Sequence, residues 1–259
     1  MKILVVGDMM GGSGRRAAAK LLHDIRAQHG CDMVIVNAEN AAGGLGITVP
    51  TAKALFDAGA DVLTMGNHTF AKRTIAPYLD DEIRIIRPAN YPPGVAGRGW
   101  GIYRSASGVS VAVISLLGRI FMEPMDCPFR AADCALKEIG DRAKVIVVDM
   151  HAEATSEKIA LGRYLDGRVS AVIGTHTHVQ TSDEKVMPGG TAYITDVGMT
   201  GVEDSVIGMD YPTVISRFLT RVSTKFELAE GEAVLRGVIV EVQPDTGRAV
   251  SITRIVIPE

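Results

Sequence analysis

The sequence predicts an α/β fold, layered α/β/α, with mixed β-sheets. Short apolar runs rich in valine and isoleucine recur along the chain, and such runs are typical of buried strands. Segments with helical spacing lie between several of these runs, which gives the alternation of an α/β protein. Nearly every apolar run ends in a polar cluster, and these clusters also indicate a function.

The expected elements follow one another in chain order. We predict strands over residues 3–7, 33–37, 62–65, 111–116, 145–150, 171–174 and 192–195. We predict helices over residues 15–28, 49–58, 131–142 and 156–165. Residues 101–117 are expected to form two adjoining strands around Ser107-Gly108. Residues 235–242 and 249–257 are expected to form a second pair around the turn Pro244-Asp245-Thr246-Gly247.

Composition favours a single domain over residues 1–259. A chain of 259 residues, 47% hydrophobic and 22% charged, is long enough to bury a substantial core. No Pro/Ser-rich linker, charge block or repeat of fixed period marks a domain boundary.

The charge of the chain argues against stable binding of nucleic acid. The formal net charge is -3 and the pI is about 6.1, so the chain has no basic field that captures a phosphate backbone by counterion release. A small phosphate ester remains a candidate substrate, because bound metal ions can supply the positive charge.

Cysteine usage and the start of the chain predict a cytoplasmic protein. Cys31, Cys127 and Cys134 show no CxxC spacing, which argues against a zinc knuckle and a disulfide framework. The apolar run at residues 3–6 is interrupted at Asp8, too early for a signal peptide or a membrane span.

The polar clusters at the strand ends predict one shared site. They are Asp8, Asn37-Ala38-Glu39-Asn40, Gly66-Asn67-His68, Asp149-Met150-His151 and His176-Thr177-His178. In open α/β sheets the carboxyl ends of the strands face a common crevice. We therefore expect these segments to meet.

The residue types in these clusters predict metal binding. Three imidazoles, two carboxylates and two amide oxygens without a thiolate suit Mn, Fe or Zn better than Cu(I) or an iron–sulfur cluster. Glu39 is the candidate for a carboxylate that bridges two ions about 3.5 to 4 Å apart. The predicted ligands are Asp8, Glu39, Asn40, Asn67, His151, His176 and His178.

His68 is the candidate general acid. Gly66 lets the backbone turn sharply, so that Asn67 can approach an ion and the ring of His68 can point at the substrate. From that position the ring would give a proton to the leaving oxygen.

Each of these residues also has a simpler interpretation. Asp8 could be a helix N-cap, His151 a hydrogen-bonded core histidine, and Asn37 is best interpreted as a turn former. His23 and His29 lie in or just after a helix and are assigned no chemistry. Four of the six histidines nevertheless fall at strand ends, which packing alone does not explain.

Taken together, these motifs resemble the calcineurin-like metallophosphoesterases, specifically the bacterial YmdB-type branch. The resemblance spans essentially the whole chain and implies a four-layer α/β/β/α sandwich with mixed β-sheets. The superfamily pattern opens Asp-x-His, whereas here Met9 and Met10 follow Asp8, and Glu39 replaces the usual bridging aspartate. The YmdB-type branch shares both departures.

The resemblance also implies a ligand assignment and a reaction. One ion would take Asp8, Glu39, Asn40 and His178, and the other would take Glu39, Asn67, His151 and His176. The ions would be Fe and/or Mn, with Zn also compatible, and would generate hydroxide from a shared water for in-line attack. The implied substrates are small cyclic nucleotides, with 2′,3′-cAMP foremost, and the implied assembly is a homo-oligomer.

Other functions stay open at this point. Gly12-Ser13-Gly14-Arg15-Arg16-Ala17 fits a dinucleotide-binding fingerprint, but residues 8–11 separate it from the strand, and it leaves the histidine motifs unexplained. The same site could serve a broader phosphomonoesterase and phosphodiesterase, or a metal- or nucleotide-binding regulator with little turnover. The Gly-rich residues 199–211 either rim the cleft or reach a partner subunit.

Overall fold

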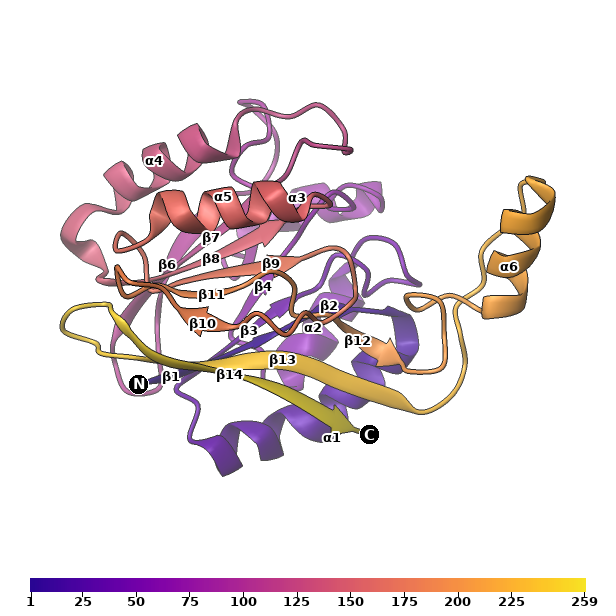
Figure 1. Ribbon diagram of the computed structural model, residues 1–259, viewed down its shortest axis with the longest axis horizontal. Coiled ribbons are helices and arrows are strands. Elements are labelled where there is room, and N and C mark those ends of the chain that lie inside the picture. Colours follow the sequence, from indigo (N-terminus) through magenta and orange to yellow (C-terminus); the bar gives the residue numbers. More distant parts are fainter.

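In the computed structural model, which describes residues 1–259, two β-sheets lie face to face between helices (Figure 1). The first sheet has eight strands in the order β2-β12-β13-β1-β3-β4-β5, with β14 paired to β13. Its strands β1, β3, β4 and β5 are parallel, and β13 runs antiparallel to β1. The strands are β1 (Lys2–Val6), β2 (Asp8–Met9), β3 (Met33–Asn37), β4 (Val62–Thr64), β5 (Ile85–Ile86), β12 (Met199–Val202), β13 (Ala233–Val242) and β14 (Ala249–Pro258).

The second sheet has six strands in the order β10-β11-β9-β8-β7-β6. Strands β7, β8, β9 and β11 are parallel, while β6 and β10 are antiparallel edge strands. The strands are β6 (Trp100–Arg104), β7 (Ser110–Leu117), β8 (Val145–His151), β9 (Ala171–Thr175), β10 (Lys185–Val186) and β11 (Ala192–Ile194). Both sheets are therefore mixed, as predicted.

Alternating side chains divide the core into layers. Ile3 and Val5 of β1 point into the apolar layer between the two sheets, whereas Leu4 and Val6 point to the outer face of the first sheet. Full burial of each such side chain stabilises the fold by about 1.5–3 kcal/mol. The four-layer α/β/β/α arrangement is confirmed.

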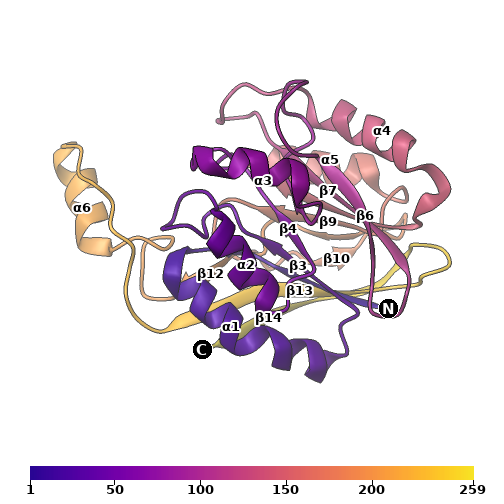
Figure 2. The ribbon, with the colours of Figure 1, turned by 180° about the vertical axis from the view of Figure 1, so that it is seen from behind.

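Five of the six α-helices cover the outer faces of the two sheets (Figures 1 and 2). Helices α1 (Gly11–His29), α2 (Val49–Asp57) and α3 (Ala76–Asp81) contribute to the core on the first sheet, and α4 (Pro128–Ile139) and α5 (Thr155–Leu165) to the core on the second. Single 3-10 turns lie at η1 (Arg73–Ile75) and η2 (Gly140–Arg142). No helix of this structure combines the length and the apolar character needed to cross a bilayer.

The glycine-rich start of α1 serves packing between this helix and β12. A Cβ atom at Gly14 would collide with the backbone oxygen of Thr200. The first helical amide, that of Gly11, donates to the carbonyl oxygen of Asn40 at 3.0 Å. Packing against β12 therefore accounts for Gly14 without a dinucleotide.

The segment after β12 forms a projection that the sequence did not predict. Helix α6 (Tyr211–Thr220) stands away from the two sheets in both views (Figures 1 and 2). Asp210 caps it by accepting from the Thr213 hydroxyl at 3.1 Å, and Val214 is its one buried residue. Contacts between Met209 and Leu228 and between Asp210 and Glu227 close its base. We call residues 205–228 the arm.

Candidate metal centre

The strand-end clusters meet at the carboxyl edge of both sheets. Glu39 follows β3 of the first sheet and His151 ends β8 of the second, and their Oε1 and Nε2 atoms lie 3.2 Å apart. Both side chains are at most 1% exposed. The segments that carry Glu39 and His151, which are far apart in the chain, therefore meet as predicted, at the place where the two sheets adjoin.

One group of predicted ligands surrounds the Nε2 atom of His151. Asn67 Oδ1 lies 3.0 Å from it, His176 Nδ1 also 3.0 Å, and Glu39 Oε1 3.2 Å. Ligand atoms of Glu39, His151 and His176 all lie within 4.8 Å of one another, a spacing that can hold an ion. These four residues are the set expected for one of the two ions.

The other four expected ligands also lie together. His178 Nε2 is 3.2 Å from Asn40 Nδ2 and 3.9 Å from Asp8 Oδ1. Asn40 Nδ2 donates to Glu39 Oε1 at 3.1 Å, so Glu39 contacts both groups. Asn40 turns its Nδ2 rather than its Oδ1 toward His178, and a half-turn of the amide would present the oxygen instead.

A buried network orients His151 from behind. His151 Nδ1 contacts the Thr175 hydroxyl at 2.8 Å, and that hydroxyl donates to Asp149 Oδ1 at 2.7 Å. Thr64 and Asn37 also donate to Asp149, at 2.5 and 3.0 Å. Such partners hold a ligating imidazole in one orientation.

Sequence reasoning assigned no role to Asp149 or Thr175. The available signal was the position of Asp149 two residues before His151, on the same face of β8. Asn37, interpreted as a turn former, does accept from the Glu39 backbone amide at 3.2 Å. Its Nδ2 also joins the Asp149 network. Asp8 does not cap α1, because Met10 is the N-cap residue and Asp8 Oδ2 accepts from the His176 amide at 3.0 Å.

The loop that carries His176 and His178 has an uncommon backbone. Both residues have positive φ, 98° and 65°, which is rare for residues other than glycine. Asp196 holds the intervening residue by accepting from the Thr177 amide at 3.0 Å and the Thr177 hydroxyl at 2.8 Å. Lys158, 0% exposed, pairs with the same carboxylate at 2.7 Å and donates to the Thr175 carbonyl at 2.6 Å.

We expect Lys158→Met to destabilise the protein by about 3–5 kcal/mol, because it leaves Asp196 buried without its cation. Urea denaturation of metal-free protein measures this loss. The control Arg163→Met, on an exposed position of the same helix, is expected to change stability by about 0.5 kcal/mol or less. Equal urea midpoints for Lys158→Met and Arg163→Met would show that the buried ion pair does not stabilise the loop that carries His176 and His178.

The charged groups of the site shift one another's pKa values. Burial alone would raise the pKa of Glu39, but His151 and His68 outweigh it and hold that pKa well below its usual value. Burial would lower the pKa of His151, but Glu39, Asp8 and Asp149 raise it to about 9. Burial raises the pKa of Asp8 to about 6, and burial together with His151 lowers the pKa of His176 to about 3.

Two observations show that the residues present fit metal ions. Asp8 Oδ1 is a buried carboxylate oxygen with no hydrogen-bond partner. Burying such an oxygen costs free energy of desolvation unless a cation contacts it. A Cβ atom at Gly66 would collide with Glu39 Oε2 and the ring of His151, so glycine keeps the space beside these ligand atoms open. The donor set of carboxylates, imidazoles and amides is one that Mn, Fe and Zn accept.

The pKa of His151 predicts that metal affinity rises with pH. An imidazole must be neutral to bind a cation, and His151 is protonated below about pH 9 in the metal-free site. Each unit of pH below that value is expected to weaken the apparent Mn²⁺ affinity by up to about tenfold. Below about pH 6, protonation of Asp8 competes as well.

Calorimetric titration with Mn²⁺ at pH 6, 7 and 8 measures this dependence. Buffers of different ionisation enthalpy report the proton released on binding. An affinity that is the same at all three pH values would contradict the proton competition at His151.

His68 lies beside both groups without being enclosed by them. Its Nδ1 contacts Asn40 Oδ1 at 2.7 Å and Glu39 Oε1 at 3.2 Å, and its amide donates to Glu39 Oε2 at 3.1 Å. The side chain is 32% exposed, and Nε2 has no hydrogen-bond partner in the chain. The ring is thus anchored through one nitrogen and presents the other to the cleft.

The site opens into a cleft of about 430 Å³, a size in the range of small-molecule sites. Glu39, Asn40, His68, His176 and His178 line part of it, together with Glu153 and Thr177, and apolar residues line much of the rest. Val206, Ile207 and Met209 come from the arm, so residues 199–211 do rim the cleft. The Ile207 carbonyl contacts His178 Nδ1 at 2.9 Å, which links the arm to a predicted ligand.

The sequence matches one family along nearly its whole length. The family model described as YmdB-like protein matches residues 4–255. The chain is 48% identical to the 2′,3′-cyclic-nucleotide 2′-phosphodiesterase of Bacillus subtilis over 257 residues, which cover 99% of this chain and 97% of that relative.

Solved structures show the same fold. A hypothetical protein from Thermus thermophilus superposes with a TM-score of 0.94 at 44% identity, covering 100% of both chains. The calcineurin-like phosphoesterase YfkN from Bacillus subtilis superposes with a TM-score of 0.59 at 12% identity, covering 99% of this chain and 90% of that one. This second likeness shows that the sandwich is the calcineurin-like phosphoesterase fold.

Proposed function

Because the chain belongs to the YmdB-like protein family, we propose that it is a metal-dependent phosphoric diester hydrolase that opens 2′,3′-cyclic nucleotides, foremost 2′,3′-cAMP. The observation that carries the proposal is the buried cluster of Glu39, His151 and His176 beside the unpartnered oxygen of Asp8, at the wall of an open cleft. A purely structural role would leave that carboxylate oxygen paired.

Two ions are the proposed cofactors, Fe and/or Mn. Asp8, Glu39, Asn40 and His178 would hold one, and Glu39, Asn67, His151 and His176 the other. When bound, such a pair lowers the pKa of a water molecule and neutralises the charge that develops on the phosphoryl group. Glu39 supports this arrangement because its carboxylate contacts residues of both sets.

The chain's own residues supply orientation and a proton. Thr175 and Asp149 hold the Nδ1 side of His151, so that its Nε2 faces the cluster. His68 is anchored through Nδ1 by Glu39, a contact that does not depend on the orientation of the Asn40 amide, and this leaves Nε2 to donate a proton to the departing ribose oxygen. That oxygen leaves as an alkoxide unless it is protonated, so the proton transfer lowers the barrier.

The proposed substrate class is a small diester rather than a long nucleic acid. The Bacillus subtilis relative is named for 2′,3′-cyclic nucleotides, and the strain of a five-membered cyclic phosphate favours its opening. The net charge of -3 supplies no basic field for a nucleic-acid backbone. We also propose a homo-oligomer, which the exposed apolar side chains of Ile215 and Leu219 on α6 support.

A substrate panel tests the proposed function. Mn²⁺-loaded protein is assayed with 2′,3′-cAMP, 3′,5′-cAMP, p-nitrophenyl phosphate and a short RNA. We expect 2′,3′-cAMP to have the highest kcat/KM and expect a chelator to abolish its hydrolysis. Faster hydrolysis of the monoester would favour a broader phosphatase, and bound metal without turnover of any compound would favour a regulator.

A further inference from the structure

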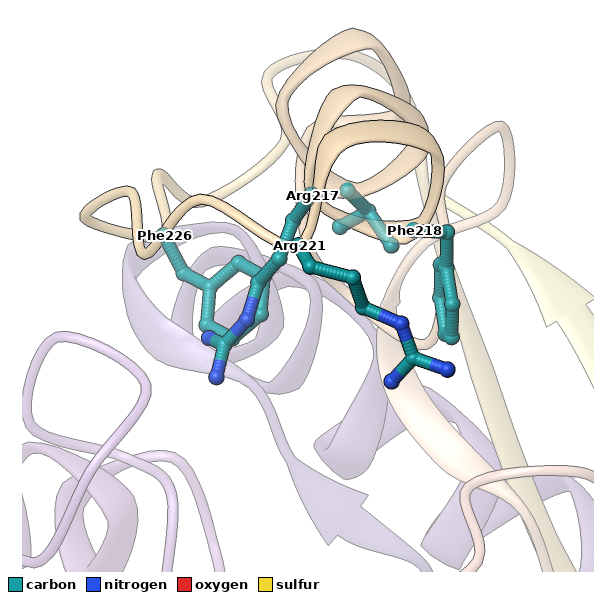
Figure 3. A pocket seen from close by; sticks show the side chains of 5 residues that line it. Arg217, Phe218, Arg221 and Phe226 are labelled. Carbon is teal, nitrogen blue, oxygen red and sulfur yellow. The ribbon is translucent and has the colours of Figure 1, made fainter.

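The arm carries a second pocket that continues from the cleft. This pocket has a volume of about 430 Å³, and its five lining residues all belong to the arm (Figure 3): Val214, Arg217, Phe218, Arg221 and Phe226. Val214, Phe218 and Phe226 also line the cleft beside Glu39 and the imidazoles. The two pockets therefore share one apolar wall, with the predicted metal ligands on one side and two arginines on the other.

The shared wall is aromatic and open to solvent. Phe218 is 76% exposed and Phe226 41% exposed, although both are large apolar side chains. A planar ligand can stack on exposed aromatic rings, and any of the nucleobases can do so because each has a flat aromatic face. Val214, Phe218 and Phe226 offer no side-chain hydrogen-bond donor or acceptor, so this wall can hold a base without reading its edge.

The two arginines have no acidic partner. Arg217 places its guanidinium over the ring of Phe226, 4.6 Å from the centroid. Arg217 and Arg221 form no ion pair, whereas six other arginines pair with carboxylates, as Arg84 does with Glu82. Figure 3 shows their side chains on the same side of α6 as the two rings. They are free to bind an anionic group, and phosphate suits the fork of a guanidinium.

The shape of a cyclic nucleotide matches this layout. Its cyclic phosphate spans one edge of the ribose, while the base and the 5′ oxygen leave from the opposite side. A nucleotide whose cyclic phosphate lies at Glu39 and the imidazoles therefore directs its base and its 5′ oxygen toward the arm. The metal centre and the arm can then hold the two ends of one ligand.

Building on the function proposed above, we propose that the arm is the nucleotide-recognition part of the same site. Phe218 and Phe226 stack the base, and Arg217 and Arg221 bind a phosphate on the 5′ oxygen. The favoured substrates are nucleoside 2′,3′-cyclic phosphates that also carry a 5′ phosphate. Purines are favoured over pyrimidines through stacking area alone.

Three compounds that share the strained ring test this proposal. Glycerol 1,2-cyclic phosphate has no base, 2′,3′-cAMP adds the base, and 2′,3′-cAMP with a 5′ phosphate adds the second anion. We expect kcat/KM to rise in that order. Phe218→Ala is expected to raise KM for 2′,3′-cAMP by about tenfold. In this variant kcat/KM for 2′,3′-cAMP is expected to exceed that for glycerol 1,2-cyclic phosphate by less than in wild type.

The arginines have a separate readout. Arg221→Gln is expected to lower the advantage conferred by the 5′ phosphate by about threefold, an effect that weakens as ionic strength rises. Phe121→Ala and Lys225→Gln are the matched controls, because both residues are exposed and neither lines the two pockets. Both controls are expected to retain the wild-type order of substrates.

A binding measurement separates this proposal from the proposed function. Metal-free protein is titrated with adenosine 5′-monophosphate and followed by saturation-transfer NMR, with Phe218→Ala as the comparison. We expect transfer to the adenine protons in wild type and its loss in the variant. Unchanged transfer in Phe218→Ala, or equal effects of Arg221→Gln and Lys225→Gln on the 5′-phosphate advantage, would overturn the role of the arm. Failure to hydrolyse all three compounds would instead contradict the proposed function, while the NMR titration still tests the arm.

Discussion

Replacing His151 with alanine is expected to abolish tight metal binding and to reduce hydrolysis of 2′,3′-cAMP by about a thousandfold or more. The Nε2 atom of His151 lies within 3.2 Å of Asn67, His176 and Glu39, so its removal empties the centre of one predicted ligand set. The loss of a bound cation costs several kcal/mol of transition-state stabilisation, and about 1.4 kcal/mol corresponds to a tenfold change in rate. Elemental analysis after dialysis and kcat/KM for 2′,3′-cAMP measure the two effects.

The matched control for this prediction is His23→Ala. His23 is exposed on α1 and contacts the Asp57 carbonyl at 3.2 Å, outside the clusters at the strand ends. We expect this variant to bind metal and turn over substrate as wild type does. Circular dichroism of both variants verifies that they fold. A folded His151→Ala variant with full metal content would remove His151 from the ligand set.

Replacing His68 with alanine is expected to leave metal content unchanged and to lower kcat for 2′,3′-cAMP by about 10²–10⁴-fold, the usual contribution of a general acid. The physical reason is the leaving group. A ribose alkoxide needs a proton, whereas p-nitrophenolate leaves without one. The same variant should therefore lose much less activity on bis-p-nitrophenyl phosphate, a difference that a disturbed ligand shell would not produce.

His68→Asn supplies a sharper control. The asparagine amide can keep the hydrogen bond that His68 Nδ1 makes to Asn40 Oδ1, but it carries no proton that it can give up. We expect this variant to be as impaired as His68→Ala on 2′,3′-cAMP. Undiminished activity in either variant would remove the general-acid assignment, and metal loss in both would instead indicate that His68 stabilises the ligand shell.

The parts of the fold that were predicted from sequence are those with local signals. The strands 33–37 and 145–150 are continuous apolar runs that end in polar residues, and the structure has β3 at Met33–Asn37 and β8 at Val145–His151. The two hairpins were predicted from Ser107-Gly108 and from the turn Pro244-Asp245-Thr246-Gly247, and both pairs are present. The family suggested by the motifs is confirmed as well.

Short elements had too little pattern to predict. Strands β2, β5 and β10 have two residues each, and no periodicity can be recognised over that length. The spacing of Val214, Ile215, Phe218 and Leu219 is helical, but α6 follows a glycine-rich stretch that was predicted either to rim the cleft or to reach a partner subunit, not to lead into a helix. Its existence was missed because most of its apolar side chains are exposed rather than buried, which is not the usual sign of a helix in a globular fold.

The sequence predicted which strand ends form the site, but it did not predict the hydrogen bonds and ion pairs that hold the candidate ligands in place. Asp8, Glu39 and His151 are residue types that commonly bind metal ions, so each could be recognised in the sequence as a candidate ligand. The order of the strands in the sheets brings the three together. The partners behind them depend on contacts across the two sheets: Asn37 reaches Asp149 over 112 positions of sequence, and Lys158 reaches Asp196 over 38. Such pairings follow from sheet register and helix packing, which the sequence does not display. The individual ligand roles stay predictions.

The number of metal ions bound per chain is the most direct test of the account. Elemental analysis of protein loaded with Mn²⁺ and then dialysed is predicted to give two ions per chain. Glu39→Gln, which removes the carboxylate charge shared by both groups while keeping the side-chain shape, is predicted to lose both ions. A Glu39→Gln variant that retains as much metal as wild type would contradict the metal centre described here.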